Sequence, residues 1–271
     1  MKNVFQITNR YMILATPLIL FSLITGVYLA SSAGAKIINL LIALILFLLM
    51  TACFIAGWFN MIKIAIAVPH RDEPNSLIKE FPSGVGEYFL PVLGMLVFML
   101  IITFSISYAG YFIGLNLIGD PSINPEALVK AMENAEALKT FMATLTPEQY
   151  IKINFWNFFL LGIMTLIYYI FLLYIPALFY KTKNPFKAFF IGLKDLFSKH
   201  IIKTTGIFLL IFVVNFFISI FSVLFSGIMI MHFAITLLNF YFITLVAVGV
   251  FYYYDKTFVQ PFIGQNIDEL V

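Results

Sequence analysis

The chain has 271 residues, of which 62% are hydrophobic and 11% are charged, and its formal net charge is +3. Soluble proteins average about 45–50% apolar and about 25% charged residues, so the composition excludes an ordinary soluble globular protein. The single cysteine, Cys53, excludes an intrachain disulfide and a multi-cysteine metal site.

Six long apolar runs follow one another along the chain, at residues 11–30, 37–62, 88–118, 153–179, 204–225 and 228–254. The last two lie within 51 consecutive residues, Thr204 to Tyr254, that contain no Asp, Glu, Lys or Arg. A hydrocarbon core about 30 Å thick needs about 20 apolar residues per helical span. The runs therefore predict an all-α fold, a polytopic bundle of six transmembrane helices that forms one integral membrane domain over residues 1–271.

The distribution of positive charge predicts the orientation of these spans. With the N-terminus inside, 12 of the 16 Lys and Arg residues fall on the inner side, and only Lys36, Lys130, Lys139 and Lys152 fall outside. Because Lys and Arg accumulate in cytoplasmic loops, we expect a multi-pass protein of the cell membrane with both termini in the cytoplasm.

Two stretches, 37–118 and 153–225, share an arrangement that suggests a parallel internal repeat separated by an outer loop, 119–152. In each, a span with a Pro-containing exit is followed by an inner connector that begins with Pro, and a glycine follows in the next span, Gly94 or Gly206. Chance similarity between apolar helices is the alternative.

The second inner connector has the pattern of an interfacial amphipathic helix. Asn184 is suited to the N-cap and Pro185 to the first helical position. One face would carry Phe186, Phe189, Phe190, Leu193, Leu196 and Phe197. Such a helix favours the headgroup plane of an anionic leaflet, although the phenylalanines could equally cover the base of the bundle. The candidate headgroup contacts are Arg71, Lys187, Lys194 and Lys199. In the first connector, Pro82, Gly84 and Gly86 are expected to interrupt the helix.

The outer loop also contains helix signals. Asn124-Pro125-Glu126 predicts a helix start, followed by an apolar stripe at Leu128, Met132, Ala135, Leu138, Met142 and Leu145. Thr146 and Gln149 have the spacing of a capping box at the start of the fourth span. This loop helix would act either as a lid or as a packed surface helix.

The segments 175–178 (Ile-Pro-Ala-Leu), 184–189 (Asn-Pro-Phe-Lys-Ala-Phe) and 251–255 (Phe-Tyr-Tyr-Tyr-Asp) resemble uncharacterised bacterial six-span proteins. Those proteins look similar to YciC-like inner-membrane proteins and to the membrane region of glycerophosphodiester phosphodiesterases. The resemblance implies membrane architecture and no activity. Only 17 residues follow Tyr254, so we expect no soluble catalytic domain like that of the phosphodiesterase.

No motif indicates catalysis. His70-Arg71-Asp72 lacks the other kinase signatures, no H-E-x-x-H, G-x-S-x-G or P-loop occurs, and the predicted spans contain no carboxylate for ion coupling. The polar intramembrane candidates are Asn116, Asn157, Asn215, His232, Thr236 and Asn239. They would either line a pathway for a neutral solute or lipid, or form hydrogen bonds between helices.

The sequence therefore favours a non-catalytic integral membrane protein that contacts membrane lipids or partner proteins. A channel, exporter or lipid-translocating permease for a neutral or amphipathic substrate is the alternative. We expect no metal, no cofactor and no nucleic-acid partner, and we consider a membrane-protein partner or a homo-oligomer.

Overall fold

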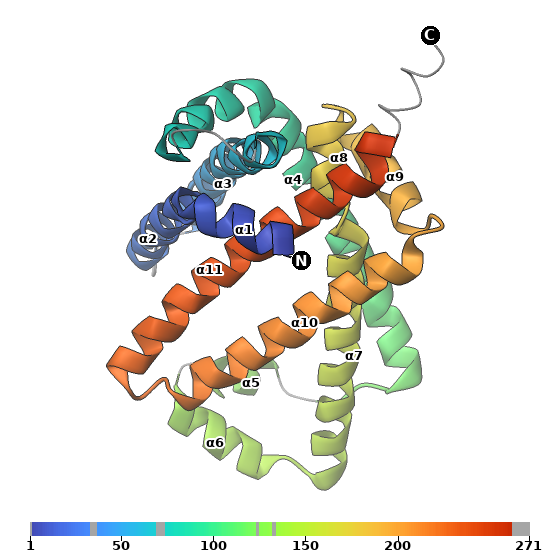
Figure 1. The fold of residues 1–271 in the computed structure, drawn as a ribbon. Coiled ribbons are helices and arrows are strands. Elements are labelled where there is room, and N and C mark those ends of the chain that lie inside the picture. Colours follow the sequence, from blue (N-terminus) through green and yellow to red (C-terminus); the bar gives the residue numbers. More distant parts are fainter. Residues whose placement is uncertain (1, 33–36, 69–73, 123–124, 132–133, 262–271) are drawn as a thin grey trace, which may run out of the picture. The chain divides into compact units, whose positions relative to one another are not determined.

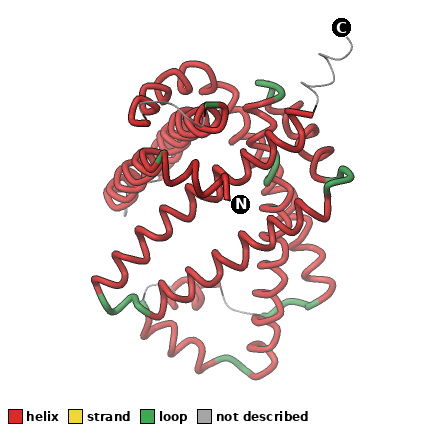
Figure 2. The backbone as a smooth tube through the Cα atoms, viewed as in Figure 1, coloured by secondary structure: helices red, strands yellow, loops and turns green. Residues whose placement is uncertain are grey.

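A computed structural model describes residues 2–32, 37–68, 74–122, 125–131 and 134–261. Within these ranges the chain forms helices joined by short loops and contains no strand (Figure 2). Six of the described helical segments are long and apolar enough to cross a membrane. They are Met12–Ser31, Leu41–Ala67, Ser76–Leu117, Pro147–Tyr180, Ile201–Leu224 and Met229–Val259. The all-α prediction with six membrane helices is confirmed.

The chain divides into two compact units, a first formed by Met1–Phe98 with Ile170–Val271 and a second formed by Met99–Tyr169. Two helices contribute to both units, α4 (Glu80–Leu117) and α7 (Pro147–Phe171). The first unit also contains α1 (Lys2–Arg10), α2 (Ala15–Ser32), α3 (Ile37–Ala67), α8 (Tyr174–Tyr180), α9 (Pro185–Leu196), α10 (Ile201–Leu224) and α11 (Met229–Tyr254).

Helix α1 precedes the first membrane span and was not predicted. It packs on α11 (Figure 1), where the side-chain amide of Asn3 donates a 3.0 Å hydrogen bond to the hydroxyl of Tyr252. The hydroxyl of Tyr241 donates a 2.6 Å bond to Oδ1 of Asn9. The polar nine-residue helix α1 therefore lies along α11, and a hydrogen bond near each of its ends holds it there.

Buried aromatic side chains join the N-terminal elements to α3. The indole of Trp58 donates a 2.7 Å hydrogen bond to the carbonyl of Leu14, and the hydroxyl of Tyr11 donates a 2.6 Å bond to the carbonyl of Val68. Phe21 of α2 stacks on Phe54 of α3 with ring centroids 4.2 Å apart. The Trp58 bond is buried, so it satisfies a carbonyl that water cannot reach.

Helices α3 and α4 approach closely at Gly84. A Cβ atom there would lie 2.5 Å from Cβ of Asn60 and 2.7 Å from the carbonyl oxygen of Ala56. Next to this contact, the amide of Asn60 donates a 3.0 Å hydrogen bond to the carbonyl of Glu80. The small residue is therefore needed to let the two helices meet.

The expected interruption of the first connector is wrong. Helix α4 begins at Glu80 and continues without a break through Pro82, Gly84 and Gly86. Pro82 lies in the first helical turn, where a missing N–H costs nothing. Glu87 consequently belongs to a membrane helix, although the predicted span began at residue 88.

The α8–α9 hairpin closes one end of the first unit. Asn184 is the N-cap of α9 and accepts a 3.1 Å hydrogen bond from the amide of Lys187, with Pro185 in the first turn, which confirms both assignments. A Cβ atom at Gly192 would lie 3.0 Å from Cα of Tyr174, so the hairpin packs backbone against backbone.

In the second unit, α4 and α7 pack against each other through two glycines. A Cβ atom at Gly110 would lie within van der Waals overlap of the Ile163 side chain, at 2.3 Å, and one at Gly114 would lie 2.4 Å from the ring of Trp156. The spacing Gly-x-x-x-Gly places both on one face of α4, where each glycine leaves room for a large side chain of α7.

The outer loop forms two helices, α5 (Pro125–Ala131) and α6 (Ala135–Thr144), where the sequence pattern predicted one. Asn134 is the N-cap of α6 and accepts a 2.7 Å hydrogen bond from the amide of Ala137. That capping bond begins a new helix and separates the predicted apolar stripe into two parts. Met132, one member of the stripe, and Asn124 lie outside the described residues.

Candidate functional site

Charged and tyrosine side chains from different helices gather at one end of the first unit. We call this group the tyrosine–lysine cluster, and its members are Lys63, Glu87, Tyr88, Tyr180, Lys181, Lys183, Asp195 and Tyr254. The elements that supply them are α3, α4, α8, α9, α11 and the α8–α9 turn. All three lysines fall on the side predicted to be cytoplasmic.

Lys63 lies inside the cluster rather than at its edge. Its ammonium group donates a 2.9 Å hydrogen bond to the hydroxyl of Tyr88 and lies 5.4 Å from the centre of that ring. The ring of Tyr180 lies 5.9 Å from the same nitrogen. The predicted span 37–62 stops one residue before Lys63, and α3 turns this side chain toward two tyrosines that stabilise a partly desolvated cation.

Lys183 and Glu87 form an ion pair beside this position. The Nζ and Oε1 atoms are 2.9 Å apart, and Lys183 also lies 5.4 Å from the centre of the Tyr88 ring. Both side chains are about half exposed, so the pair contributes little to stability. The Lys183 side chain therefore lies half exposed at the edge of the cluster, with its ammonium group paired to Glu87.

Asp195 of α9 connects the α8–α9 hairpin to α11. Its Oδ2 atom accepts a 2.6 Å hydrogen bond from the hydroxyl of Tyr254 and forms a 2.9 Å ion pair with Lys181. The Lys181 ammonium also lies 5.4 Å from the centre of the Tyr254 ring. One carboxylate thus holds two elements together at this end of the unit.

Two tyrosine hydroxyls, those of Tyr174 and Tyr180, are buried and have no hydrogen-bond partner in the part of the chain that the structure describes. The Tyr180 ring packs 6.1 Å from that of Tyr254 and faces Lys63. A buried hydroxyl without a partner is uncommon, and in Tyr180 it belongs to a ring that lies against the Lys63 ammonium group.

Helix α9 carries Lys187 and Lys194, which the sequence analysis selected, and Lys199 follows three residues after its end. Its predicted aromatic face is divided into a buried stripe and an exposed stripe. Leu196 is buried and the ring centres of Phe189 and Tyr174 are 5.5 Å apart, so these side chains pack against the rest of the first unit. Phe186, Phe190 and Phe197 instead remain 58%, 63% and 60% exposed. The side chains of Lys187, Lys194 and Lys199 are exposed and form no ion pair with a described residue.

The fourth predicted headgroup contact, Arg71, lies outside the described residues. Asn116 and Asn157 belong to the second unit, where both are exposed and neither side chain has a hydrogen bond with a described residue.

The remaining polar candidates, Asn215 of α10 and His232, Thr236 and Asn239 of α11, lie on a single hairpin in the first unit. Thr236 donates its hydroxyl to the carbonyl of His232 within the same helix, at 2.9 Å. Asn215 and His232 are exposed. Within the described chain, these side chains therefore do not form the hydrogen bonds between helices that the sequence analysis considered.

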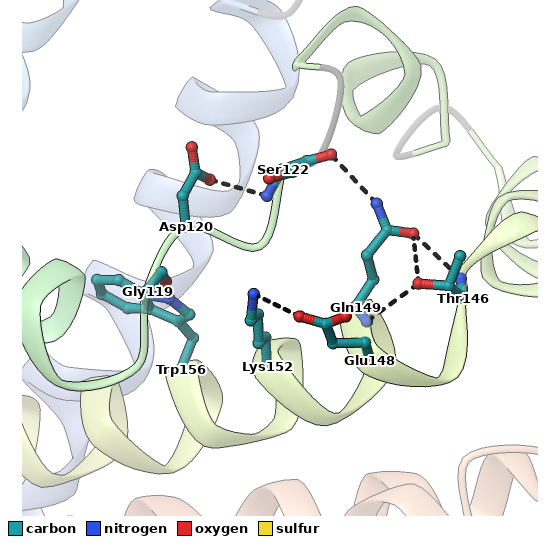
Figure 3. Close-up of polar contacts among 8 residues, drawn as sticks. All are labelled: Gly119, Asp120, Ser122, Thr146, Glu148, Gln149, Lys152 and Trp156. Carbon is teal, nitrogen blue, oxygen red and sulfur yellow. Dashed lines mark hydrogen bonds and ion pairs between the residues drawn. The ribbon is translucent and has the colours of Figure 1, made fainter.

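A second polar group surrounds the start of α7 in the second unit (Figure 3). The predicted capping box is confirmed, since the amide of Gln149 donates to Oγ1 of Thr146 at 3.3 Å and the amide of Thr146 donates to Oε1 of Gln149 at 3.1 Å. Gln149 also donates to the carbonyl of Ser122 at 3.2 Å, and the Trp156 indole donates to the carbonyl of Gly119 at 3.0 Å. These bonds join the end of α4 to the start of α7.

Each unit has an open recess in its surface. In the first unit, a recess of about 440 Å³ lies between α3 and α4 and is lined by Cys53, Val85, Gly86, Glu87, Phe89, Leu90 and Pro91. In the second, one of about 320 Å³ is lined by Leu117, Ile118, Glu148, Ile151, Lys152 and Phe155. Both are mainly apolar, and each has a charged side chain in its lining, Glu87 in the first and Glu148 with Lys152 in the second.

The described residues contain no group of three or more His, Cys, Asp or Glu side chains that could hold a metal ion. Comparison of the chain with protein-family models, with curated proteins and with solved structures gives no match. The resemblance to the YciC-like group therefore stays a prediction.

Sequence analysis missed most of the tyrosine–lysine cluster because its members are far apart in the chain. Tyr88 and Tyr180 lie within or beside apolar runs, and nothing near Asp195 in the sequence marks it as a contact of α11. The signal available was the presence of ionisable side chains at the ends of apolar runs, since such residues in membrane helices commonly mark functional sites.

Proposed function

We propose that this integral membrane protein binds anionic phospholipid headgroups at the inner surface of the membrane through α9 and the adjacent tyrosine–lysine cluster. Both termini then lie in the cytoplasm, and the protein carries out no catalytic step. The observation that supports this function best is the exposed surface of α9, which presents phenylalanine and lysine side chains side by side.

At about 100° per residue, the exposed side chains of Phe186, Phe190 and the C-cap residue Phe197 fall within about 40° of one another around the axis of α9. Lys187 and Lys194 fall on a second stripe about 70° away, also exposed. A helix of this kind lies in the interface plane, with its aromatic side chains in the acyl boundary and its lysines among the headgroups. The buried stripe of α9 fixes this orientation relative to the rest of the first unit.

The tyrosine–lysine cluster supplies a second reason to expect anionic lipid here. The Lys183 side chain is about half exposed at its edge, and the Lys63 ammonium group lies against the rings of Tyr88 and Tyr180. Basic positions between membrane helices on the cytoplasmic side bind phosphate-containing headgroups. The apolar recess between α3 and α4 includes Glu87, the partner of Lys183, and would accept part of an acyl chain.

Titration of the detergent-purified protein with fluorescent phosphatidylglycerol tests the proposal. Replacing Lys187, Lys194 and Lys199 with Gln should raise the Kd about fivefold at low ionic strength, because one headgroup contacts one of these exposed lysines at a time and such a contact contributes up to about 1 kcal/mol. Increasing the salt concentration should weaken binding to the unaltered protein and have less effect on the variant.

A matched variant replaces Lys130, Lys139 and Lys152 with Gln, which removes the same charge from the second unit. It should keep the original Kd. Unchanged binding in the α9 variant, or equal losses in both variants, would contradict the proposal. Phosphatidylcholine should bind weakly to all three proteins, since it carries no net charge for lysine to recognise.

The alternative, a permease for a neutral or amphipathic substrate, receives no comparable support. The polar candidates of the first unit all lie on the α10–α11 hairpin: Asn215, His232, Thr236 and Asn239. Among the described residues, no hydrogen bond joins the side chains of any two of them, since the Thr236 hydroxyl donates to the backbone carbonyl of His232. A pathway would need such side chains to converge on a shared cavity.

A further inference from the structure

The recess between α3 and α4 has a single charged side chain in its lining, and that side chain is acidic. It is Glu87, which is 42% exposed, and the other lining residues are a cysteine, a glycine and apolar side chains. A phospholipid whose headgroup carries only negative charge would be repelled by this carboxylate as it approached the recess. The lining therefore calls for a ligand with a positive group next to its apolar part.

The recess lies where the headgroup and the acyl chains of a lipid would meet. Glu87 immediately precedes the predicted span 88–118, which contains no charged residue, so its carboxylate lies at headgroup depth on the predicted inner side. Phe89, Leu90 and Pro91 continue the lining into the apolar part of α4, and Leu90 is 74% exposed. The recess thus has an acidic end near the membrane surface and an apolar end below it.

The partner of Glu87 supplies a positive charge at the same place. Lys183, in the α8–α9 turn, has its Nζ atom 2.9 Å from Oε1 of Glu87, and its side chain is 56% exposed. An ion pair this exposed contributes little free energy, so its members can exchange partners at small cost. Lys63 lies as close to the Tyr88 ring as Lys183 does, 5.4 Å from its centre, and adds positive potential on the lysine side.

We propose that this recess binds the headgroup of an ethanolamine phospholipid, with the ammonium group at Glu87 and the phosphate at Lys183. Such a headgroup carries one charge of each sign, so it replaces one ion pair by two. A purely anionic headgroup would take Lys183 from Glu87 and leave that carboxylate beside a second negative charge. The inference refines the proposed function by naming a lipid class for this edge of the tyrosine–lysine cluster, and it rests on that cluster lying at the membrane surface.

Choline is disfavoured at the same position. Its nitrogen carries methyl groups and no N–H, so it cannot donate a hydrogen bond to the carboxylate as the Lys183 ammonium can. Quaternary ammonium groups are recognised by cages of aromatic rings, and among the described residues that line the recess only Phe89 has a ring. The neighbouring Tyr88 ring already lies against the ammonium groups of Lys63 and Lys183.

Titration of the detergent-purified protein with phospholipids labelled on an acyl chain tests the site, because the headgroup stays unmodified. The unaltered protein should bind phosphatidylethanolamine, and stepwise N-methylation of that lipid should raise the Kd until phosphatidylcholine binds most weakly. Glu87→Gln should raise the Kd for phosphatidylethanolamine about fivefold and leave that for phosphatidylcholine unchanged. Glu80→Gln is the matched control, because it removes the same charge from α4 about 10 Å away, and it should keep the original Kd.

The variant that replaces Lys187, Lys194 and Lys199 with Gln separates this site from the proposed function. It should bind phosphatidylglycerol more weakly and keep its affinity for phosphatidylethanolamine, and an equal loss for both lipids would contradict a separate site. Equal binding of phosphatidylethanolamine and phosphatidylcholine to the unaltered protein would overturn the inference.

Glu87→Gln also distinguishes a ligand from a competitor. If this variant bound phosphatidylethanolamine unchanged and phosphatidylglycerol more tightly, Glu87 would only block an anion site, and the inference would be wrong. Thermal unfolding identifies a variant that has failed to fold. The N-methylation series on the unaltered protein then decides, because it needs no substitution.

Discussion

The two units of this protein hold their helices together mainly through different kinds of contact. The first is held together by side chains that hydrogen-bond to backbone carbonyls and by a largely buried carboxylate, as at Trp58, Tyr11 and Asp195. The second joins α4 to α7 through Gly110 and Gly114, with polar bonds where the two helices end. The comparison shows that hydrogen bonds and ion pairs between elements are concentrated in the unit that contains the tyrosine–lysine cluster.

Both kinds of contact follow from the solvent. Lipid is as apolar as leucine, so burial of apolar area gives membrane helices little reason to associate, and close packing and hydrogen bonds take its place. Glycine contacts make two helices adhere, whereas hydrogen bonds from different elements fix their register. The first unit has both, since Gly84 also brings α3 against α4.

The largest effect is expected for Gly84→Ala. The new methyl group would overlap Cβ of Asn60 and the carbonyl of Ala56, neither of which can move without the helix, and the cost should be about 3 kcal/mol. Thermal unfolding in detergent measures the loss. Gly86→Ala is the control, because its Cβ would meet nothing within 4 Å, and its melting temperature should stay the same or rise.

Asp195→Ala should cost about 2 kcal/mol, because it removes the acceptor of the Tyr254 hydroxyl and the carboxylate next to Lys181. The side chain of Asp195 is only 13% exposed, so water replaces these contacts poorly. Thermal unfolding measures this loss too. Glu148→Ala, which breaks an exposed ion pair with Lys152 in the second unit, should leave the melting temperature unchanged. Equal losses would refute the contrast between the two units.

In the second unit, Gly114→Ala should destabilise the α4–α7 contact by about 1–2 kcal/mol. The methyl group would lie 2.4 Å from the Trp156 ring, which can turn aside in part. Limited proteolysis of the outer loop measures local opening, and cleavage should become faster. Gly162→Ala on α7, where the space is open, should show no increase. The same rate in both variants would count against close glycine packing.

The smallest effect is expected for Tyr11→Phe, which removes one hydrogen bond to the carbonyl of Val68 and should cost about 1 kcal/mol. Tyr168→Phe is the comparison, because that side chain is 69% exposed. A shift in melting temperature for Tyr11→Phe alone is the expected result. No shift in either variant would mean that the Val68 carbonyl finds another donor.

Features set by local sequence could be predicted, and features set by distant contacts could not. The six spans, the N-cap at Asn184 and the capping box at Thr146 depend on residues within a few positions of one another. The continuity of α4 through Gly84 was missed because the reason for that glycine is Asn60, 24 positions away. The Gly110 and Gly114 contact was predictable from its spacing, but its partner helix was not.

The candidate site divides in the same way. The amphipathic pattern of residues 184–199 is local, so it identified Lys187, Lys194 and Lys199. The contacts among Lys63, Tyr88 and Tyr180 come from three different helices, so the sequence alone did not reveal them. Sequence also could not say which phenylalanines of α9 face the unit, because that depends on what packs against it. Phe189 and Phe190 are neighbours in the chain and differ in exposure for this reason.

The immersion depth of α9 tests the central claim most directly. In a Cys53→Ser background, spin labels at positions 187 and 190 can be compared in vesicles containing phosphatidylglycerol by their accessibility to oxygen and to a water-soluble relaxation agent. The account predicts that the label at position 190 lies about 5–10 Å inside the headgroup boundary, while that at position 187 lies among the headgroups. Two labels that are equally accessible to the water-soluble agent would contradict the account.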